Sequence, residues 1–282
     1  MKVKVILSWV LMLLISVSVF AGPVTFNDPN LLQAVRNAYE AQVGIPLSDP
    51  PTSEELSNPA FLELDASNLG ISDLTGLEAC ISLQNLNLIE NQIVDVSPIG
   101  GLTNLVSLKL GKNQITDISP LSGLSSNLLL LDIGYNEISD ISVLASFTNL
   151  YGLNLGLGVI GLYDEIDYFA TGVNNLDDSD MNVLTNLTNL GILSIGGLEN
   201  VTSISFLNSL PDLTQLYLGS NPITDWSPLS SVAGSLNGFV VANCGLTQSA
   251  LNTYVANMTN ITFINADNPG ILGIIAVSYT HL

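Results

Sequence analysis

The chain has 282 residues, a formal net charge of −20 and only five lysine and arginine residues. This acidic balance argues against nucleic-acid binding and against contact with anionic membrane surfaces, because both need patches of basic residues. The single histidine, His281, lies beside the carboxyl terminus. It falls in the tail 276–282, which we expect to be non-native, so we expect no Ser-His-Asp or Cys-His catalytic group and no enzymatic activity.

Residues 1–21 have the pattern of a secretory signal peptide. Two lysines precede an apolar run that begins at Val5, and Val19 and Ala21 suit cleavage before Gly22. An uncleaved membrane anchor is the alternative, but the apolar run is short for a membrane span. We therefore expect a secreted or cell-surface protein whose mature chain is not inserted in a membrane.

Residues 22–60 are predicted to form an amino-terminal helical cap. Asp28 and Pro29 have the order of a helix N-cap and a first-turn proline. Thr52 and Glu55 have the spacing of a capping box at the start of a second short helix. Such an amphipathic segment is suited to cover the exposed apolar end of a stack of repeats.

From residue 61 to residue 275 the chain is predicted to form nine coils of one repeat. The units LQNLNLIENQIVDVSPIGGL and LVSLKLGKNQITDISPLSGL follow one another, and most opening positions are 22 to 25 residues apart. Self-similarity at this period is typical of a solenoid, in which no unit buries its apolar face alone. The apolar residues that open the nine coils are Phe61, Leu83, Leu105, Leu128, Leu150, Leu190, Leu213, Leu236 and Ile261.

Each unit follows the order L-x-x-L-x-L-x-x-N-x-I-x-D-I-S-P-L. The alternation in L-x-L predicts a short strand with one buried face, and stacking the units joins these strands in a parallel sheet. The aspartate and the Ser-Pro pair are suited to begin a turn on the opposite, convex side. The asparagine can bond the backbone of its own coil and of a neighbouring coil. This predicted asparagine ladder consists of Asn91, Asn113, Asn136 and Asn221.

Several coils depart from asparagine at the ladder position. The residues expected to replace asparagine there are Leu69 in the first coil, Gly158 in the fifth, Glu199 in the sixth, Cys244 in the eighth and Pro269 in the ninth. A buried thiol can replace the amide at Cys244, but the other substitutions weaken the ladder, most of all in the second half of the chain.

An insertion of about 18 residues, at about 159–179, interrupts the period. Insertions in solenoids form loops on one face, often a binding face. Calcium is conceivable for a loop this acidic, yet the spacing of an EF-hand loop is absent, which favours a solvated loop. The acids of this region are Asp164, Glu165, Asp167, Asp177, Asp178 and Asp180.

The two cysteines, Cys80 and Cys244, lie in coils that are far apart along the predicted stack. Because neighbouring strands are separated by about 4.8 Å, the two thiols are well beyond disulfide reach. Neither cysteine has metal-ligand spacing, so we expect no bound metal and no cofactor.

The repeat unit resembles that of internalin-type bacterial leucine-rich repeat proteins, over roughly residues 23 to 270. The run FNDPNLLQAV likewise resembles the amino-terminal cap of secreted bacterial leucine-rich proteins. The resemblance implies an α/β fold: a slightly curved leucine-rich repeat solenoid with a parallel sheet on its concave face. Turns of 3₁₀ or irregular form are expected on the convex face. The concave face is expected to bind a macromolecule, often one on another cell.

One candidate cluster on the concave face holds both basic residues of the repeat region. It consists of Lys109, Lys112, Asp132 and Tyr135. The alternative interpretation is a lateral lysine–aspartate pair of little energetic value.

A second candidate cluster is aromatic and apolar at positions expected to be solvated. It consists of Ile192, Gln215, Tyr217, Val240 and Phe263. Aromatic side chains placed in this way are usual anchors of interfaces. Ordinary cross-strand packing is the alternative.

Three functions remain open at this point. The first is adhesion or recognition by a monomer that binds protein or glycan on another cell or in the extracellular matrix. The second is a structural segment of a larger surface protein, and the third is an enzyme that uses acids of the insertion. Residues 276–282, AVSYTHL, resemble a translated sequencing-adapter remnant, so we expect this tail to be non-native.

Overall fold

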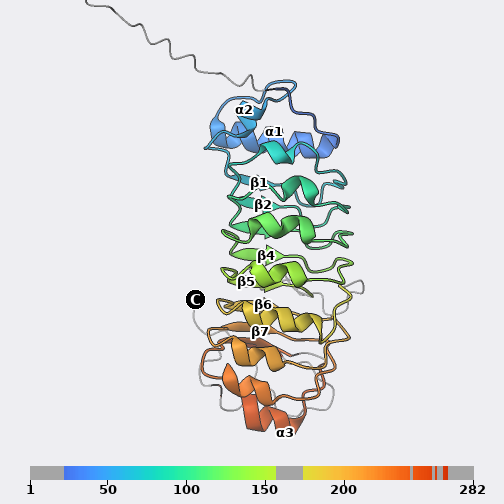
Figure 1. Cartoon of the computed structure of the whole chain (residues 1–282), viewed down its shortest axis with the longest axis vertical. Helices are drawn as coiled ribbons and strands as arrows, with labels where there is room; N and C mark the ends of the chain where they lie inside the picture. The colour runs from blue at the N-terminus through green and yellow to red at the C-terminus, as the bar shows by residue number, and fades with distance from the viewer. Residues whose placement is uncertain (1–21, 157–173, 242–243, 256–257, 259–262, 266–282) are drawn as a thin grey trace, which may run out of the picture.

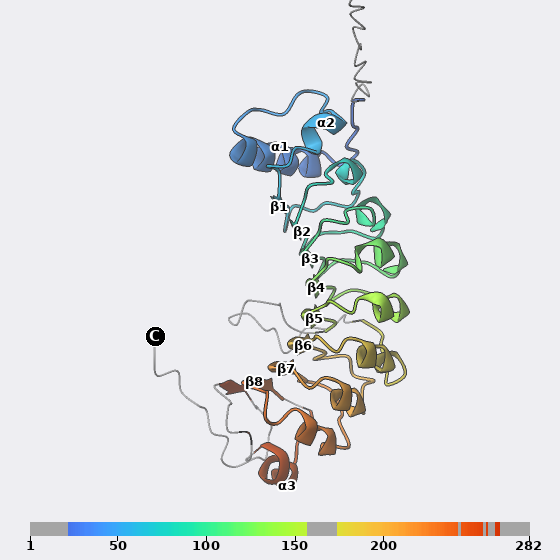
Figure 2. The ribbon, with the colours of Figure 1, turned by 60° about the vertical axis from the view of Figure 1, so that its left-hand side comes forward.

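The computed structural model describes residues 22–156, 174–241, 244–255, 258 and 263–265. These residues form a solenoid whose nine strands make one parallel sheet, with each strand paired to the next along the chain. Figure 1 shows the stack from α1 at one end to α3 at the other, and Figure 2 shows the strands along its inner, concave side. The strands are β1 (Glu63–Asp65), β2 (Asn85–Asn87), β3 (Ser107–Lys109), β4 (Leu130–Asp132), β5 (Gly152–Asn154), β6 (Ile192–Ser194), β7 (Gln215–Tyr217), β8 (Gly238–Val240) and β9 (Phe263–Asn265).

The register of the sheet follows the repeat. Leu86 of β2 pairs with Leu64 of β1 and with Leu108 of β3, and these middle residues are buried in the core. Their neighbours on each strand face the concave side, because side chains alternate along a strand. The predicted leucine-rich repeat solenoid is therefore confirmed.

Short helical turns form the convex side opposite the strands. In the regular coils an aspartate accepts a hydrogen bond from the backbone two residues later, as from Ser97 N–H to Asp95 (2.8 Å). The serine of the Ser-Pro pair is therefore not the N-cap: Ser97 is the first residue of the turn, its N-cap is Val96, and Asp95 binds the Ser97 N–H from one residue further back. The 3₁₀ turns are η1 (Leu77–Ala79), η2 (Ser97–Ile99), η3 (Ser119–Leu124), η4 (Ser142–Ser146), η5 (Asp180–Asn186), η6 (Ser205–Ser209) and η7 (Ser227–Ser231).

Helix α1 (Pro29–Val43) covers the first coil, as predicted for a cap. The Asp28 carboxylate accepts hydrogen bonds from the backbone of Asn30 and Leu31, so it is the expected N-cap. The same carboxylate also accepts from Ser72 N–H in the first coil (3.0 Å), which ties the cap to the solenoid. Gly44, at φ 82°, ends the helix in a left-handed conformation that glycine adopts without strain.

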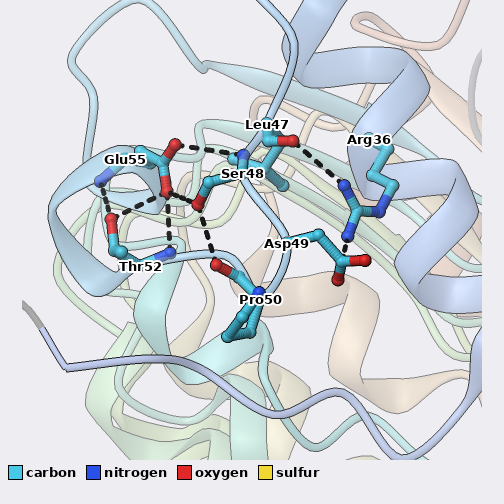
Figure 3. Close-up of polar contacts among 7 residues, drawn as sticks. All are labelled: Arg36, Leu47, Ser48, Asp49, Pro50, Thr52 and Glu55. Carbon is cyan, nitrogen blue, oxygen red and sulfur yellow. Dashed lines mark hydrogen bonds and ion pairs between the residues drawn. The ribbon is translucent and has the colours of Figure 1, made fainter.

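The loop between α1 and α2 (Ser53–Leu56) is held by polar contacts at both ends (Figure 3). Arg36 donates to Leu47 O (3.0 Å) and pairs with Asp49 (2.9 Å). Glu55 accepts from Thr52 N–H (2.8 Å) and from the hydroxyl of Ser48 (2.6 Å), and the predicted capping box of Thr52 and Glu55 is present. These contacts join the loop to the two cap helices.

The asparagine ladder lies inside the stack, as predicted. Asn113 Nδ2 donates to the carbonyl oxygens of Leu88 and Leu110, each at 2.9 Å, and Asn113 Oδ1 accepts from Ile93 N–H (3.0 Å). One amide therefore satisfies backbone groups of two adjacent coils that would otherwise be buried without partners. Asn91 and Asn136 make the equivalent bonds.

In the fifth coil the ladder position is filled by Asn174, which we did not expect. Asn174 Nδ2 donates to Ile133 O (2.9 Å) and Leu155 O (2.7 Å), and its Oδ1 accepts from Ile138 N–H (3.0 Å). Gly158, the residue expected here by counting, lies outside the described residues. The expectation failed because Asn174 lies 16 residues further along the chain than a fixed period places the ladder position.

The sixth coil also differs from the expectation. Gly197 has the left-handed conformation that precedes the ladder position in other coils, and Leu198 is buried there, whereas Glu199 is exposed. The Asn200 N–H, which is equivalent to the Ile93 N–H bonded by Asn113, donates to Leu198 O instead (2.6 Å). Asn221 Oδ1 in the next coil is therefore the one buried side-chain oxygen or nitrogen of the described residues without a hydrogen-bond partner. In the eighth coil Cys244 occupies the position as predicted, and its thiol donates to Val241 O.

The insertion ends earlier than expected: we placed its end at about residue 179, but the regular coil has already resumed at Asn174. From Asn174 onward the chain is again part of a regular coil: Leu176 is buried in the core and η5 begins at Asp180. The sequence suggested a longer loop because Asp177, Asp178 and Asp180 continue its acidic composition.

A second series of asparagines, missed in the sequence, runs along the edge of the stack. Each precedes the leucine that opens a coil, and its Nδ2 donates to a carbonyl of the coil before, as from Asn149 to Ser126 O (2.8 Å). The recurring pair Asn-Leu is the signal that could have revealed them. The series comprises Asn104, Asn127, Asn149 and Asn189.

The far end of the described chain contains α3 (Gln248–Ala250) and a π-helical turn, η8 (Leu251–Val255). Both lie within the segment 247–260 whose spacing is helical in the sequence. The predicted signal peptide 1–21, the tail 276–282 and the expected ladder position Pro269 lie outside the described residues.

Candidate binding face

The residues proposed for binding lie on the concave face where the register places them. The third residue of each strand forms one column across the sheet, in which Lys109 neighbours Asp132 and Tyr217 neighbours Val240. Ile192 and Gln215 are paired in the column of first strand residues. The columns continue through all nine strands, so the two candidate clusters belong to one surface.

The second cluster is only partly accessible. Ile192, Gln215 and Tyr217 are half-buried, and the Tyr217 hydroxyl donates to Gln215 Oε1 (3.3 Å). Val240, which we expected to be solvated, is 1% exposed and so presents almost no surface to a partner. The backbone of Phe263 pairs with Gly238 in the sheet, but its side chain lies outside the described part of the structure.

Asp132 in the first cluster is 2% exposed, which corrects the expectation of a solvated ligand-binding carboxylate. Its Oδ1 accepts from Gly134 N–H (3.1 Å) and from Asn154 Nδ2 (2.9 Å). Burial raises the pKa of this carboxyl to about 7, although both hydrogen bonds and the charges of Lys109 and Lys112 act in the opposite direction. Asp132 is therefore close to half-protonated at neutral pH.

Lys112 pairs with Glu90 in the preceding coil, at 2.7 Å, rather than with Asp132. Its Nζ also lies 5.8 Å from the centre of the Tyr135 ring. Glu90, Lys112 and Tyr135 share the same corner of three successive coils, and all three have a positive φ. The ion pair is exposed on both sides, so its net contribution to stability is small.

Glycines form a flat floor beside the central column because adjacent coils approach closely there. A Cβ added to Gly134 would collide with the backbone of Gly156 and with the Asn154 side chain. A Cβ added to Gly156 would collide with the backbone of Gly196. The glycines are thus required by the stacking of the coils, and the flat floor is a consequence of that stacking.

An exposed apolar area at the edge of the sheet was not identified in the sequence. Leu129 is 42% exposed and Tyr151 is 47% exposed, and each immediately precedes its strand. The residue before the strand lies outside the L-x-L pattern, and its equivalents range from Gly191 to Tyr151, so no periodic signal marks it.

The acids after the insertion have structural roles. Asp178 accepts from Thr202 N–H (2.8 Å), the Thr202 hydroxyl (2.6 Å) and Ser203 N–H (2.9 Å) in the next coil. Asp177 accepts from Ser179, and Asp180 from the backbone of Asp177. In the described ranges no group of three or more histidine, cysteine or acidic residues could hold a metal ion. Asp164, Glu165 and Asp167 lie outside those ranges.

Both cysteines are buried thiols outside any disulfide, and burial raises the pKa of the Cys80 thiol to about 12. Cys80 therefore lacks the exposed, low-pKa environment of a reactive cysteine, and Cys244 lacks the exposure. Over the part of the chain that the structure covers, every helix is too short or too polar to cross a bilayer.

Comparisons with known proteins agree with this architecture. The family model "Leucine Rich repeats (2 copies)" matches residues 81–123 and 193–231. The crystal structure of an internalin (inlF) from Listeria monocytogenes is 32% identical with a TM-score of 0.69, over 89% of this chain and 66% of that one. The chain belongs to the internalin-type leucine-rich repeat proteins.

Two further structures place this internalin-type chain among its relatives. Internalin C2 from Listeria monocytogenes is 29% identical with a TM-score of 0.67, and the match covers 86% of this chain and 94% of that one. A leucine-rich repeat protein of Leptospira interrogans, LIC12759, is 21% identical with a TM-score of 0.56, over 75% of this chain and 50% of that one, and shares the fold. A search of curated proteins gave no match.

Proposed function

We propose that this internalin-type chain is a secreted or cell-surface recognition module that binds a protein or glycan through its concave face. Leucine-rich repeat proteins, internalins included, act in protein binding and recognition. The signal-peptide pattern of residues 1–21 supports export. Catalysis has no part in the proposal, because the acids described after the insertion are engaged in turns and in contacts between coils.

The observation that carries the proposal is the partly exposed group formed by Ile192, Gln215 and Tyr217 on β6 and β7. These three side chains lie on adjacent strands of a rigid sheet, and none of them carries a charge. An aromatic ring beside an aliphatic group and an amide offers apolar contact together with hydrogen bonding, as interface anchors do.

A glycan and extracellular-protein array probed with residues 22–282 tests the proposal. We expect captured ligands to be lost, or weakened at least tenfold, with Tyr217→Ala, because truncating a central aromatic anchor removes most of its contact area. Val94→Ala is the matched control, since Val94 is 54% exposed but lies outside the strands. Retention of every captured ligand by Tyr217→Ala would exclude this part of the concave face.

A further inference from the structure

An apolar strip runs along the edge of the sheet where the chain enters the strands. We define the edge strip as Val106, Leu129, Leu130, Tyr151 and Ile192. Backbone hydrogen bonds join its members coil to coil: Leu129 N–H donates to Val106 O (2.9 Å), Tyr151 N–H to Leu129 O (2.8 Å) and Ile192 N–H to Tyr151 O (2.9 Å). Its members therefore follow the solenoid axis through four successive coils, from β3 to β6.

The edge strip is more accessible than the concave clusters. Leu129 and Tyr151 are 42% and 47% exposed, and Val106, Leu130 and Ile192 are half-buried. Large apolar side chains exposed singly are normal, but adjacent ones that extend over several coils mark an interaction surface. The strip also meets the concave group at Ile192, so the two surfaces are continuous.

The ring of Tyr151 occupies the space that a side chain at Gly191, in the next coil, would otherwise fill. A Cβ on Gly191 would collide with the ring and the hydroxyl of Tyr151. The ring thus lies against the Gly191 backbone and loses little further freedom when a partner binds, which favours affinity. Among the hydrogen bonds of the described residues, none involves the Tyr151 hydroxyl, which is thus open to a partner.

The two columns that hold the strip contain negative charge and no positive charge; the basic residue on its strands is Lys109, at the far end of β3. These columns comprise two positions of each coil: the residue before the strand and the first residue of the strand. Over coils one to eight, the single charged side chain at these positions is Glu63, in the first coil of the stack. Asp212 is exposed in the segment that leads into β7, near the other end. The formal net charge of −20 adds a long-range negative potential.

We propose that the edge strip binds a positively charged protein segment that places an apolar side chain beside Tyr151 and Leu129. Aliphatic side chains offer a glycan few hydrogen bonds, so the strip fits protein better. A second copy of this chain is disfavoured because two molecules, each at −20, repel one another. The proposal rests on the recognition role proposed above and extends its surface over the edge of the sheet.

Three fluorescent peptides of equal length test this assignment against residues 22–282. One alternates lysine and leucine, one alternates glutamate and leucine, and one alternates lysine and serine. By fluorescence anisotropy at physiological salt we expect the lysine–leucine peptide to bind at least tenfold more tightly than either of the others. Tyr151→Ser and Leu129→Ser should each weaken it at least fivefold, whereas Val94→Ser should leave it unchanged. Both strip residues are exposed, and matching thermal melts would show that the fold is retained.

Equal binding of the glutamate–leucine peptide, or binding that Tyr151→Ser does not weaken, would overturn the proposal. Sedimentation that shows a dimer of the wild type broken by Tyr151→Ser would assign the strip to a second copy instead. The concave site is judged separately, by the effect of Tyr217→Ala on the ligands captured by the array. Loss of those ligands together with unchanged peptide binding by Tyr151→Ser would leave the proposed function standing without the edge strip.

Discussion

At the scale of single residues, Asp65 and Asp132 show how position in the stack changes the chemistry of one column. Asp65 is exposed; burial raises its pKa, but hydrogen bonds from Ser67 and Asn87 outweigh this, and the net pKa is lowered. Asp132 occupies the same column three coils later, where burial dominates and raises the pKa to about 7. The same residue type at the same repeat position is thus an anion in one coil and a partly protonated group in another.

The raised pKa of Asp132 predicts a pH dependence of stability. Between pH 4 and pH 7 the folded carboxyl holds a proton that the unfolded one, with its ordinary pKa of 3.8, has lost. Stability therefore falls as pH rises through this window and levels off above it. Asp132→Asn should remove this fall and raise the free energy of unfolding at pH 8 by roughly 2–4 kcal/mol, with little change at pH 4.

Urea unfolding of wild type and Asp132→Asn at pH 4 and pH 8 measures this effect. Asp65→Asn is the control, because the pKa of Asp65 is lowered and its ionised form already stabilises the fold. No gain at pH 8 is expected from that variant. A destabilised Asp132→Asn at pH 8 would mean that the carboxylate of Asp132 is bound in its charged form.

At the scale of the element, the coil is held by one amide that bonds two turns of the solenoid. The side chain of Asn113 makes hydrogen bonds to four backbone groups: three carbonyls accept from its Nδ2, and one N–H donates to its Oδ1. Asn221 keeps its donor bonds to Ile195 O and Leu218 O, but its Oδ1 has no partner because the Asn200 N–H of the sixth coil donates to Leu198 O instead. The junction between these coils is therefore the weakest of those described with an asparagine.

Alanine substitution in the ladder should reveal this difference. Asn113→Ala leaves several buried backbone groups without partners, and we expect a loss of about 2–4 kcal/mol in the free energy of unfolding. Asn221→Ala removes fewer bonds and also removes an unpaired oxygen, so its loss should be smaller by about 1 kcal/mol or more. Thermal and urea unfolding of the two variants provides the comparison. Equal losses would show that the amide oxygen contributes little.

At the scale of the whole molecule, stability is distributed along the stack. Every strand pairs only with its neighbours in sequence, so no contact of the sheet joins distant coils. A cap covers the first coil through Asp28, and the core continues through the coils without a break. Because acids greatly outnumber bases, mutual repulsion of carboxylates acts against this extended but folded arrangement.

Salt should therefore stabilise the protein. Raising sodium chloride from about 10 mM to about 150 mM shortens the Debye length from roughly 30 Å to 8 Å and screens the repulsion. We expect the melting temperature to rise by a few degrees, and to rise equally with potassium chloride. Calorimetric melts at each ionic strength provide the test. A melting temperature that falls or stays constant would mean that attractive pairs, such as Arg36 with Asp49, outweigh the repulsion.

The repeat pattern correctly predicts the solenoid, the strand register, and the caps at Asp28 and Thr52. It also predicts the ladder at Asn91, Asn113, Asn136 and Asn221. These features depend on spacing within one coil or between adjacent coils, and regular spacing is visible in the chain. Three features are visible only in the folded stack: Asn174 restores the ladder, Leu198 interrupts it, and Asp132 and Val240 are buried.

The edge strip also required the tertiary structure, because Val106, Leu129 and Tyr151 each look ordinary in their own coil. They become one surface through backbone hydrogen bonds between coils, and Tyr151 is oriented by a glycine forty positions later in the chain. Periodicity reports which side chains enter the core, since burial of apolar groups recurs in every unit. It cannot report which outward-facing side chains meet, because that depends on contacts between coils whose residues differ from one to the next.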